Sequence, residues 1–313
     1  MKRVVSLIPS ATEIVAALGC GDRLVGRSHE CDFPPEVARL PVCTGARIDT
    51  GAHSAAIDSE VRALLQSALA VYDIDLHRLR ALKPDLIVTQ SQCDVCAVSL
   101  ADVESALADW QGVDRPALVS LAPGCLGDVW RDIGRVAAAL GVPDRGAQLV
   151  GTLQEDLHRL AAATSPGKDR PRVACIEWTE PLMLAGNWVP ELVRLAGGEP
   201  VGVVEAGHSP YFDSTTLFEA APDLLVFMPC GFGLERTERE ARRLLGQPGW
   251  QALDAVRQGR VYVTDGNQFF NRPGPRLRES AQILAEIIRG DSMRQRSPGW
   301  RPLIIESGAV TAA

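Results

Sequence analysis

The stretch from Asp144 to Thr164 most constrains the fold, because it predicts one long helix between two similar halves of the chain. Leucines recur at helical spacing on one of its faces, at Leu149, Leu153, Leu157 and Leu160. Pro143 precedes the stretch and Ser165-Pro166-Gly167 follows it, and these are helix start and stop signals. About 20 residues at ~1.5 Å each give a rod of roughly 30 Å. We therefore expect a stiff connection between two lobes.

Length and composition indicate an ordinary folded chain. Its 313 residues are enough for two domains with cores of their own, and 46% hydrophobic with 23% charged residues is typical of soluble proteins. The net charge is −7, and Lys and Arg are scattered singly. Because a nucleic-acid-binding surface needs a basic cluster, we set a nucleic-acid partner aside.

The N-terminus has two basic residues and an apolar stretch, as a weak signal peptide would. We interpret it instead as a strand, Val4–Ile8, followed by a helix that the capping-box pattern Ser10-Ala11-Thr12-Glu13 opens. No run approaches the roughly 20 apolar residues that a membrane span needs. We therefore expect no membrane span and a cytoplasmic location.

Strands and helices alternate along both halves, which predicts mainly parallel sheets covered by helices. The expected strands include Val4–Ile8, Arg23–Gly26, Asp85–Val88, Ala117–Leu121, Arg172–Ile176, Leu224–Phe227 and Arg260–Val263. The fold class is α/β, with two Rossmann-like lobes joined by a single backbone helix. The predicted parts are an N-terminal lobe (1–126), connecting helices (127–166), a C-terminal lobe (167–290) and a tail (291–313) that is packed on the surface or frayed.

Several motifs carry a resemblance to a known family. They are Val5–Glu13, the loop ending Asp32-Phe33-Pro34-Pro35, Leu82–Val88, Ala185-Gly186, Leu195–Gly198, Ala221–Val226 and Gly274-Pro275-Arg276. In these, over roughly residues 1 to 290, the chain resembles the helical-backbone class of solute-binding proteins, most closely its vitamin B12 (cobalamin)-binding branch. The resemblance implies a ligand cleft between two α/β lobes, and delivery of the ligand to an ABC importer.

The chain departs from that pattern in its N-terminus and in its cysteines. It shows no convincing export signal or lipobox, so an importer is a partner only if the chain is exported. An importer subunit whose start codon lies upstream is a further interpretation. Four cysteines follow predicted strands at Cys31, Cys93, Cys96 and Cys230. Because ligands collect at the carboxyl ends of parallel strands, we expect these thiols to face the cleft.

Four thiolates could bind zinc tetrahedrally or hold an iron–sulfur cluster, and the Cys93/Cys96 spacing suits either. The alternative is that these cysteines are small buried side chains or unpaired thiols. The other candidate ligand contacts are His29, Glu177, Trp178, His208, Tyr211, Phe232 and Arg272.

These candidates divide by their chemistry. The two histidines could ligate a metal, or the cobalt of a corrinoid, or be merely solvated. The aromatic residues could present flat faces to a large planar ligand. Glu177 could contact the ligand or dock a partner, and the guanidinium of Arg272 could reach a carboxylate, phosphate or carboxamide.

Two hypotheses of function follow. The leading hypothesis is a non-catalytic cytosolic protein that binds a corrinoid (cobalamin-like) or similarly large ligand, because of the family resemblance and the aromatic residues in the predicted cleft loops. The common catalytic motifs are absent from the sequence. The rival is a metal or iron–sulfur protein, with or without enzymatic activity, that uses the four cysteines.

Overall fold

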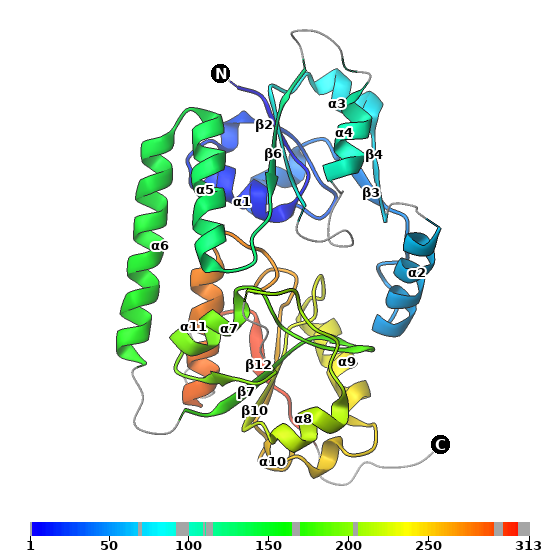
Figure 1. Cartoon of the computed structure of the whole chain (residues 1–313), viewed down its shortest axis with the longest axis vertical. Coiled ribbons are helices and arrows are strands. Elements are labelled where there is room, and N and C mark those ends of the chain that lie inside the picture. Colours follow the sequence, from blue (N-terminus) through cyan, green and yellow to red (C-terminus); the bar gives the residue numbers. More distant parts are fainter. Residues whose placement is uncertain are drawn as a thin grey trace. The chain divides into compact units, whose positions relative to one another are not determined.

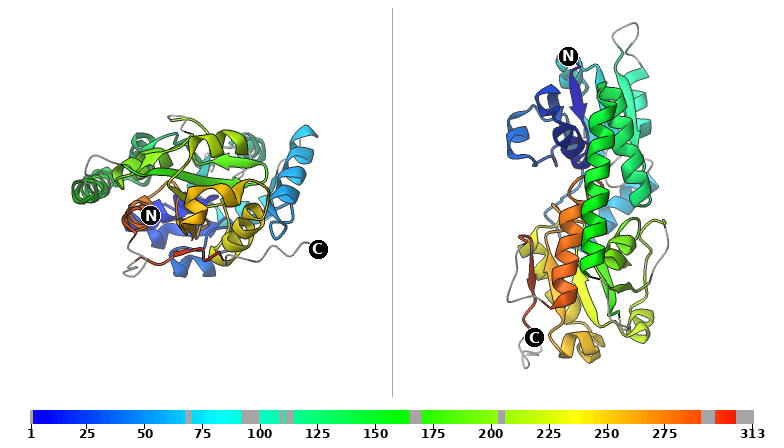
Figure 2. Two further views of the ribbon diagram at one scale, coloured as in Figure 1. Left: turned by 90° about the horizontal axis from the view of Figure 1, so that it is seen from below. Right: turned by 90° about the vertical axis from the view of Figure 1, so that its left-hand side faces the viewer.

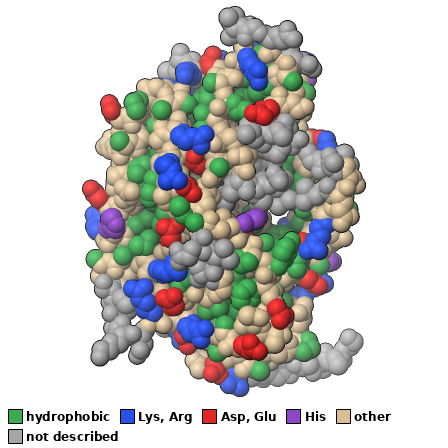
Figure 3. All heavy atoms as spheres, viewed as in Figure 1, with side chains coloured by type: hydrophobic (Ala, Val, Ile, Leu, Met, Phe, Trp, Pro, Cys, Tyr) green, Lys and Arg blue, Asp and Glu red, His purple; other side chains and the backbone are tan. Residues whose placement is uncertain are grey.

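The computed structural model describes residues 2–67, 71–91, 100–108, 110, 115–164, 170–202, 206–290 and 297–305. The chain forms two compact units (Figure 1). Unit 1 comprises residues 1–52 and 56–153, and unit 2 comprises residues 53–55 and 154–313. Acidic and basic side chains are interspersed over the face drawn in Figure 3. Within the described ranges, no helix is both long and apolar enough to cross a membrane.

Unit 1 is built on a four-stranded parallel sheet in the order β2-β1-β5-β6. Its strands are β1 (Val4–Ser6), β2 (Leu24–Arg27), β5 (Leu86–Gln90) and β6 (Ala117–Leu121). A separate antiparallel pair is formed by β3 (Thr44–Ala46) and β4 (Tyr72–Ile74). The helices are α1 (Pro9–Ala17), α2 (Ser54–Gln66), α3 (Leu76–Leu82), α4 (Leu100–Ala108) and α5 (Leu126–Leu140), with 3-10 turns η1 (Gly21–Arg23) and η2 (Pro35–Arg39).

The two faces of this sheet are covered by different helices. Leu7 of the β1 segment and Ile87 of β5 share a buried core with Leu79 of α3 and Leu107 of α4. Side chains alternate between the faces of a strand, so Ser6 lies on the opposite face. There the Thr12 hydroxyl of α1 donates to the Ser6 hydroxyl at 2.8 Å. Helix α1 therefore covers the face that the core of α3 and α4 does not.

The long helix α6 (Pro143–Ala163) begins one residue before the expected stretch. Its first half belongs to unit 1 and its second half to unit 2. Gly146 allows α5 to come close, because a Cβ there would lie only 2.5 Å from the Cβ of Ala137. In the second half, α11 (Leu277–Arg289) runs alongside, and Arg278 pairs with Asp156 at 2.9 Å (Figure 2). The predicted backbone helix is confirmed.

Unit 2 has a mixed sheet in the order β12-β11-β10-β7-β8, in which the three central strands are parallel. Its strands are β7 (Arg172–Thr179), β8 (Leu182–Leu184), β9 (Glu199–Pro200), β10 (Leu224–Phe227), β11 (Val261–Thr264) and β12 (Trp300–Pro302). Strands β8 and β12 are antiparallel to their neighbours, and β9 pairs with β7. The helices besides α11 are α7 (Val189–Leu195), α8 (Ser214–Ala220), α9 (Leu234–Leu245) and α10 (Asp254–Arg257), with the 3-10 turn η3 (Trp250–Ala252).

Two local predictions are wrong. Helix α1 begins at Pro9 with Ile8 as its cap residue, so Ser10 lies in the first turn and not at the cap. Proline is favoured at the first helical position because its missing N–H has no partner to lose there. The C-terminal segment is also more than a surface tail, since β12 pairs with β11 and Trp300 is buried. The α/β class with two units and one long helix is confirmed.

Candidate functional site

The carboxyl end of the sheet in unit 2 brings together residues from distant parts of the chain. The backbone N–H of Cys230, after β10, donates to the carbonyl of Glu177 in β7 at 3.3 Å. The Ser209 hydroxyl donates to the Glu177 carboxylate at 2.7 Å and accepts the backbone N–H of Gly186 at 3.0 Å. A Cβ at Gly186 would lie 2.6 Å from the carbonyl oxygen of Gly207, so only glycine fits there. Ser209 thus fixes Glu177 between two loops.

An aromatic pair lies at the same edge. The rings of Trp178 and Phe232 have centroids 5.1 Å apart and are tilted by 54°. The guanidinium carbon of Arg236 lies 3.6 Å from the centroid of the Phe232 ring, which is close enough for a cation–π contact. Phe232 is buried, whereas Trp178 is half-buried and its indole N–H donates to the carbonyl of Glu180 at 3.1 Å. Trp178 is therefore the member of the pair that a ligand can reach.

Arg272 is connected to this pair through one asparagine. Its Nη2 donates to the side-chain oxygen of Asn267 at 3.1 Å, and the Asn267 backbone N–H donates to the carbonyl of Phe232 at 3.1 Å. The Arg272 side chain is buried, which fixes its guanidinium instead of leaving it as a surface charge. These bonds connect Arg272 to the loop that carries Phe232, and its contact with a ligand stays a prediction.

His208 and Tyr211 flank Ser209 on one loop. His208 is exposed, and Tyr211 is 62% exposed, an unusual value for a large aromatic side chain. Tyr211 forms an isolated backbone bridge with Met183, so the loop is held against β8. The loop thus presents an imidazole and a phenol to solvent beside Glu177.

In unit 1, His29 and Cys31 lie on the loop after β2. The thiol of Cys31 is buried, and its Sγ lies 3.0 Å from the Thr12 hydroxyl oxygen. The His29 Nδ1 lies 2.8 Å from the Thr44 hydroxyl, and the His29 ring centroid lies 5.5 Å from that of Tyr72. Burial, and after it the Arg27 guanidinium, lowers the pKa of His29, which favours the neutral imidazole.

The predicted metal ligands divide between described and undescribed parts of the chain. Cys93 and Cys96 lie outside the described residues, and Cys31 and Cys230 belong to different units. Among the described residues, no group of three or more His, Cys, Asp or Glu could hold a metal ion. A zinc or iron–sulfur site therefore has no support from the described part of the chain.

Two polar residues at the carboxyl edge of unit 1 were not predicted as site residues from the sequence. Ser10, in the first turn of α1, is 1% exposed, and Gln90, the last residue of β5, is 3% exposed. Among the residues that the structure describes, neither the Ser10 Oγ nor the Gln90 Oε1 has a hydrogen-bond partner. Gln90 could have been predicted as a site residue, because it is a polar residue at the end of a buried strand. Ser10 was interpreted as a helix cap and was therefore not considered as a site residue.

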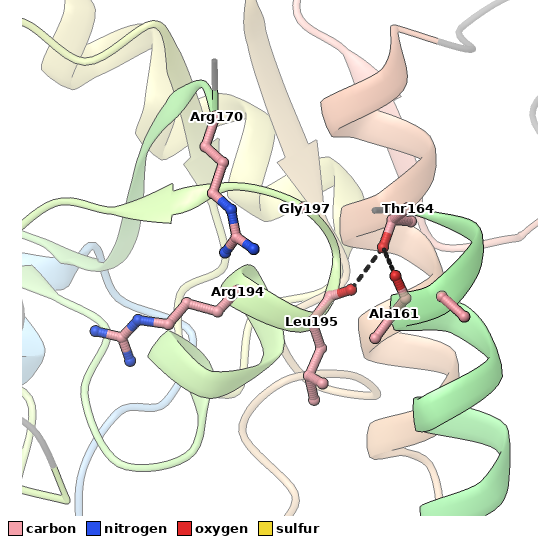
Figure 4. A pocket seen from close by; sticks show the side chains of 7 residues that line it. Ala161, Thr164, Arg170, Arg194, Leu195 and Gly197 are labelled. Carbon is pink, nitrogen blue, oxygen red and sulfur yellow. Dashed lines mark hydrogen bonds between the residues drawn. The ribbon is translucent and has the colours of Figure 1, made fainter. Parts of the chain in front are cut away.

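A hollow of about 360 Å³ lies elsewhere in unit 2, at the end of α6 (Figure 4). It is lined in part by Arg170 and Arg194, and the Thr164 hydroxyl donates to the Leu195 carbonyl at 2.8 Å. Arg194 lies in the last turn of α7, where a basic side chain stabilises the helix dipole. This structural role accounts for Arg194.

The chain is similar to a substrate-binding lipoprotein and to proteins described as binding vitamin B12 or haem. It is 24% identical to an uncharacterized ABC transporter substrate-binding lipoprotein, YvrC, of Bacillus subtilis, over 94% of this chain and 82% of the relative. It is 24% identical to a vitamin B12-binding protein of Vibrio parahaemolyticus, over 88% and 85%. Its fold matches that of a periplasmic haem-binding protein, RhuT, of Roseiflexus in apo form, with a TM-score of 0.69, 23% identity and coverage of 92% and 98%.

These similarities correct one prediction and identify the family. The expected cytoplasmic location is wrong, because the similar proteins include a lipoprotein and a periplasmic protein. None of the three is described as a zinc or iron–sulfur protein. The sequence model of the periplasmic binding protein family matches residues 4–267. The chain therefore belongs to the periplasmic binding protein family.

Proposed function

We propose that this chain is the substrate-binding protein of an ABC importer and that it binds a corrinoid outside the cytoplasm. The observation that carries the proposal is the aromatic and polar edge of unit 2. There the ring pair Trp178 and Phe232 lies beside the hydrogen-bonded groups of Glu177 and Ser209. A large macrocycle with polar side groups needs both an apolar face and a few placed polar contacts.

The relatives support this ligand class. One similar protein is described as vitamin B12-binding, and another as a substrate-binding lipoprotein of an ABC transporter. Haem is the second candidate, because the exposed loop with His208 and Tyr211 offers a nitrogen and an oxygen of the kinds that bind haem iron. Both candidates are flat tetrapyrrole-derived macrocycles, and they differ in their peripheral groups.

Calorimetric titration with cyanocobalamin, dicyanocobinamide and haemin separates the candidates. We expect the two corrinoids to bind and to quench the fluorescence of Trp178. We expect Trp178→Ala to weaken binding by about tenfold, the upper range for a lost aromatic contact, and Trp178→Phe to retain most of it. If only haemin binds, the ligand is haem and not a corrinoid. Absence of heat with all three ligands would contradict the proposed function.

A further inference from the structure

The carboxyl edge of unit 1 contains polar atoms that the protein itself does not satisfy. The Ser10 Oγ and the Gln90 Oε1 are both buried and have no hydrogen-bond partner among the described residues. Buried polar atoms without partners are rare in folded proteins, and each calls for an explanation such as a bound water, ion or ligand. These two atoms do not belong to the aromatic site of unit 2.

The sheet register places the two residues near one another. Ser6 of β1 pairs with Val88 of β5, and the backbone N–H of Leu7 donates to the Val88 carbonyl at 2.9 Å. Gln90 lies two residues beyond Val88 on an unbroken strand, so its side chain points to the same face as that of Ser6. On that face Thr12 of α1 bonds to Ser6. The Gln90 side chain is therefore directed toward the start of α1, where Ser10 lies.

The start of α1 adds hydrogen-bond donors. The first backbone N–H groups of a helix have no partner within the helix. The cap residue Ile8 supplies no side-chain bond, and the first turn of the nine-residue helix holds no acidic residue. This end of α1 therefore favours an oxygen acceptor, whereas the Gln90 Oε1 requires a donor. A primary carboxamide supplies both, from one C=O and one NH₂.

We propose that Ser10, Gln90 and the first turn of α1 form a subsite of unit 1 for a primary carboxamide. The inference rests on the proposed function, since a corrinoid carries several such amides. The propionates of haem accept hydrogen bonds but, when ionised, donate none. Glu13, three residues after Ser10 and so on the same side of α1, is buried and adds carboxyl oxygens that favour a hydrogen-bond donor on the ligand. The subsite therefore selects amidated macrocycles.

The test compares two neutral corrinoids that differ in donors. Dicyanocobinamide carries primary amides, whereas the heptamethyl ester of dicyanocobyrinic acid carries esters, which accept but cannot donate. We expect the wild-type chain to prefer the amide. Gln90→Leu should weaken cobinamide binding by about 3- to 10-fold, the range of one neutral hydrogen bond, and leave ester binding within about twofold. Ser10→Ala should act in the same direction, and Gln148→Leu, on the exposed surface of α6, is the matched control.

The outcomes separate the subsite from the function. If the wild-type chain binds neither compound, the proposed function and the subsite both fail. If it binds cobinamide but Gln90→Leu and Ser10→Ala change the affinities for amide and ester equally or not at all, the subsite is wrong and the function stands. In that case the buried atoms hold only an internal water.

Discussion

At the scale of single residues, the two cysteines at the edge of unit 2 differ in their surroundings. Cys175 lies within β7, where burial, and after it the charge of Glu177, raises the pKa of its thiol to about 12. Cys230 is half-buried after β10. Since the thiolate is the reactive form, we expect iodoacetamide at pH 8 to modify Cys230 and spare Cys175. Mass spectrometry of the native protein checks this, and the same reaction in urea should modify both. Rapid native modification of Cys175 would contradict its burial.

The raised pKa of Cys175 also predicts a pH dependence of stability. The unfolded thiol ionises near its ordinary pKa of 9.0, whereas the folded thiol stays protonated up to about 12. Between these values the unfolded state binds fewer protons, so the free energy of unfolding falls as the pH rises. At pH 10 the loss is about 1 kcal/mol. Urea unfolding at pH 8 and pH 10 should show this loss in the wild-type chain and not in Cys175→Ala. An equal fall in the free energy of unfolding of both proteins would show that titratable groups other than Cys175 cause it.

Residue positions in the site were only partly predictable. The sequence places Glu177, Trp178 and Cys230 after buried strands, and the structure brings them to one edge. The bond between Ser209 and Glu177 joins residues 32 positions apart, and no local pattern marks it. Sequence periodicity reports which face a residue occupies, but not which loop from another part of the chain meets it.

At the scale of elements, two glycines of α6 differ in their surroundings. A Cβ at Gly146 would lie 2.5 Å from the Cβ of Ala137 in α5, whereas a Cβ at Gly151 would meet nothing within 4 Å. Alanine is favoured over glycine in a helix by up to about 1 kcal/mol. We therefore expect Gly151→Ala to raise the free energy of unfolding, and Gly146→Ala to lower it by about 1–3 kcal/mol through overpacking. Urea unfolding checks both. An equal increase in the free energy of unfolding for both variants would show that α5 moves aside freely.

Strand β12 depends on one buried carboxylate of α11. Glu286 accepts hydrogen bonds from the Ser297 hydroxyl at 2.8 Å and from the Trp300 indole N–H at 2.9 Å. Burial acts to raise the pKa of Glu286, but the bonds from Ser297 and Trp300 outweigh it and lower the pKa overall. Its contribution to stability is therefore present above the ordinary pKa of 4.5 and lost as the pH falls through the lowered value. We expect Glu286→Ala to expose the C-terminal strand to limited proteolysis at pH 7, where the wild-type strand resists. Glu279→Ala, at a half-buried position of the same helix, is the control.

Helices and strands were predicted best where the apolar residues recur with a clear period and clear stop signals follow. Helix α6 has both, and its start differs by one residue from the prediction. Strands β3, β8 and β12 are only three residues long, and each pairs antiparallel with its neighbour. Strands of three residues are too short for the alternation of apolar and polar side chains to be recognised in the sequence. Their formation also depends on pairing with a neighbouring strand more than on local propensity.

At the scale of the whole molecule, the proposed ligand should stabilise the folded chain by mass action. A ligand that binds only the folded state adds about 2.7 kcal/mol at a concentration of one hundred times Kd. For a chain of this size, that corresponds to a rise in Tm of several degrees, which increases with the logarithm of the cobinamide concentration. Because Trp178 is half-buried, Trp178→Ala should change the ligand-free Tm little while requiring about tenfold more ligand for the same rise. Scanning calorimetry over a range of cobinamide concentrations checks both. A large fall in the ligand-free Tm of Trp178→Ala would show that Trp178 belongs to the core. A wild-type Tm that does not depend on ligand concentration would contradict binding to the folded chain.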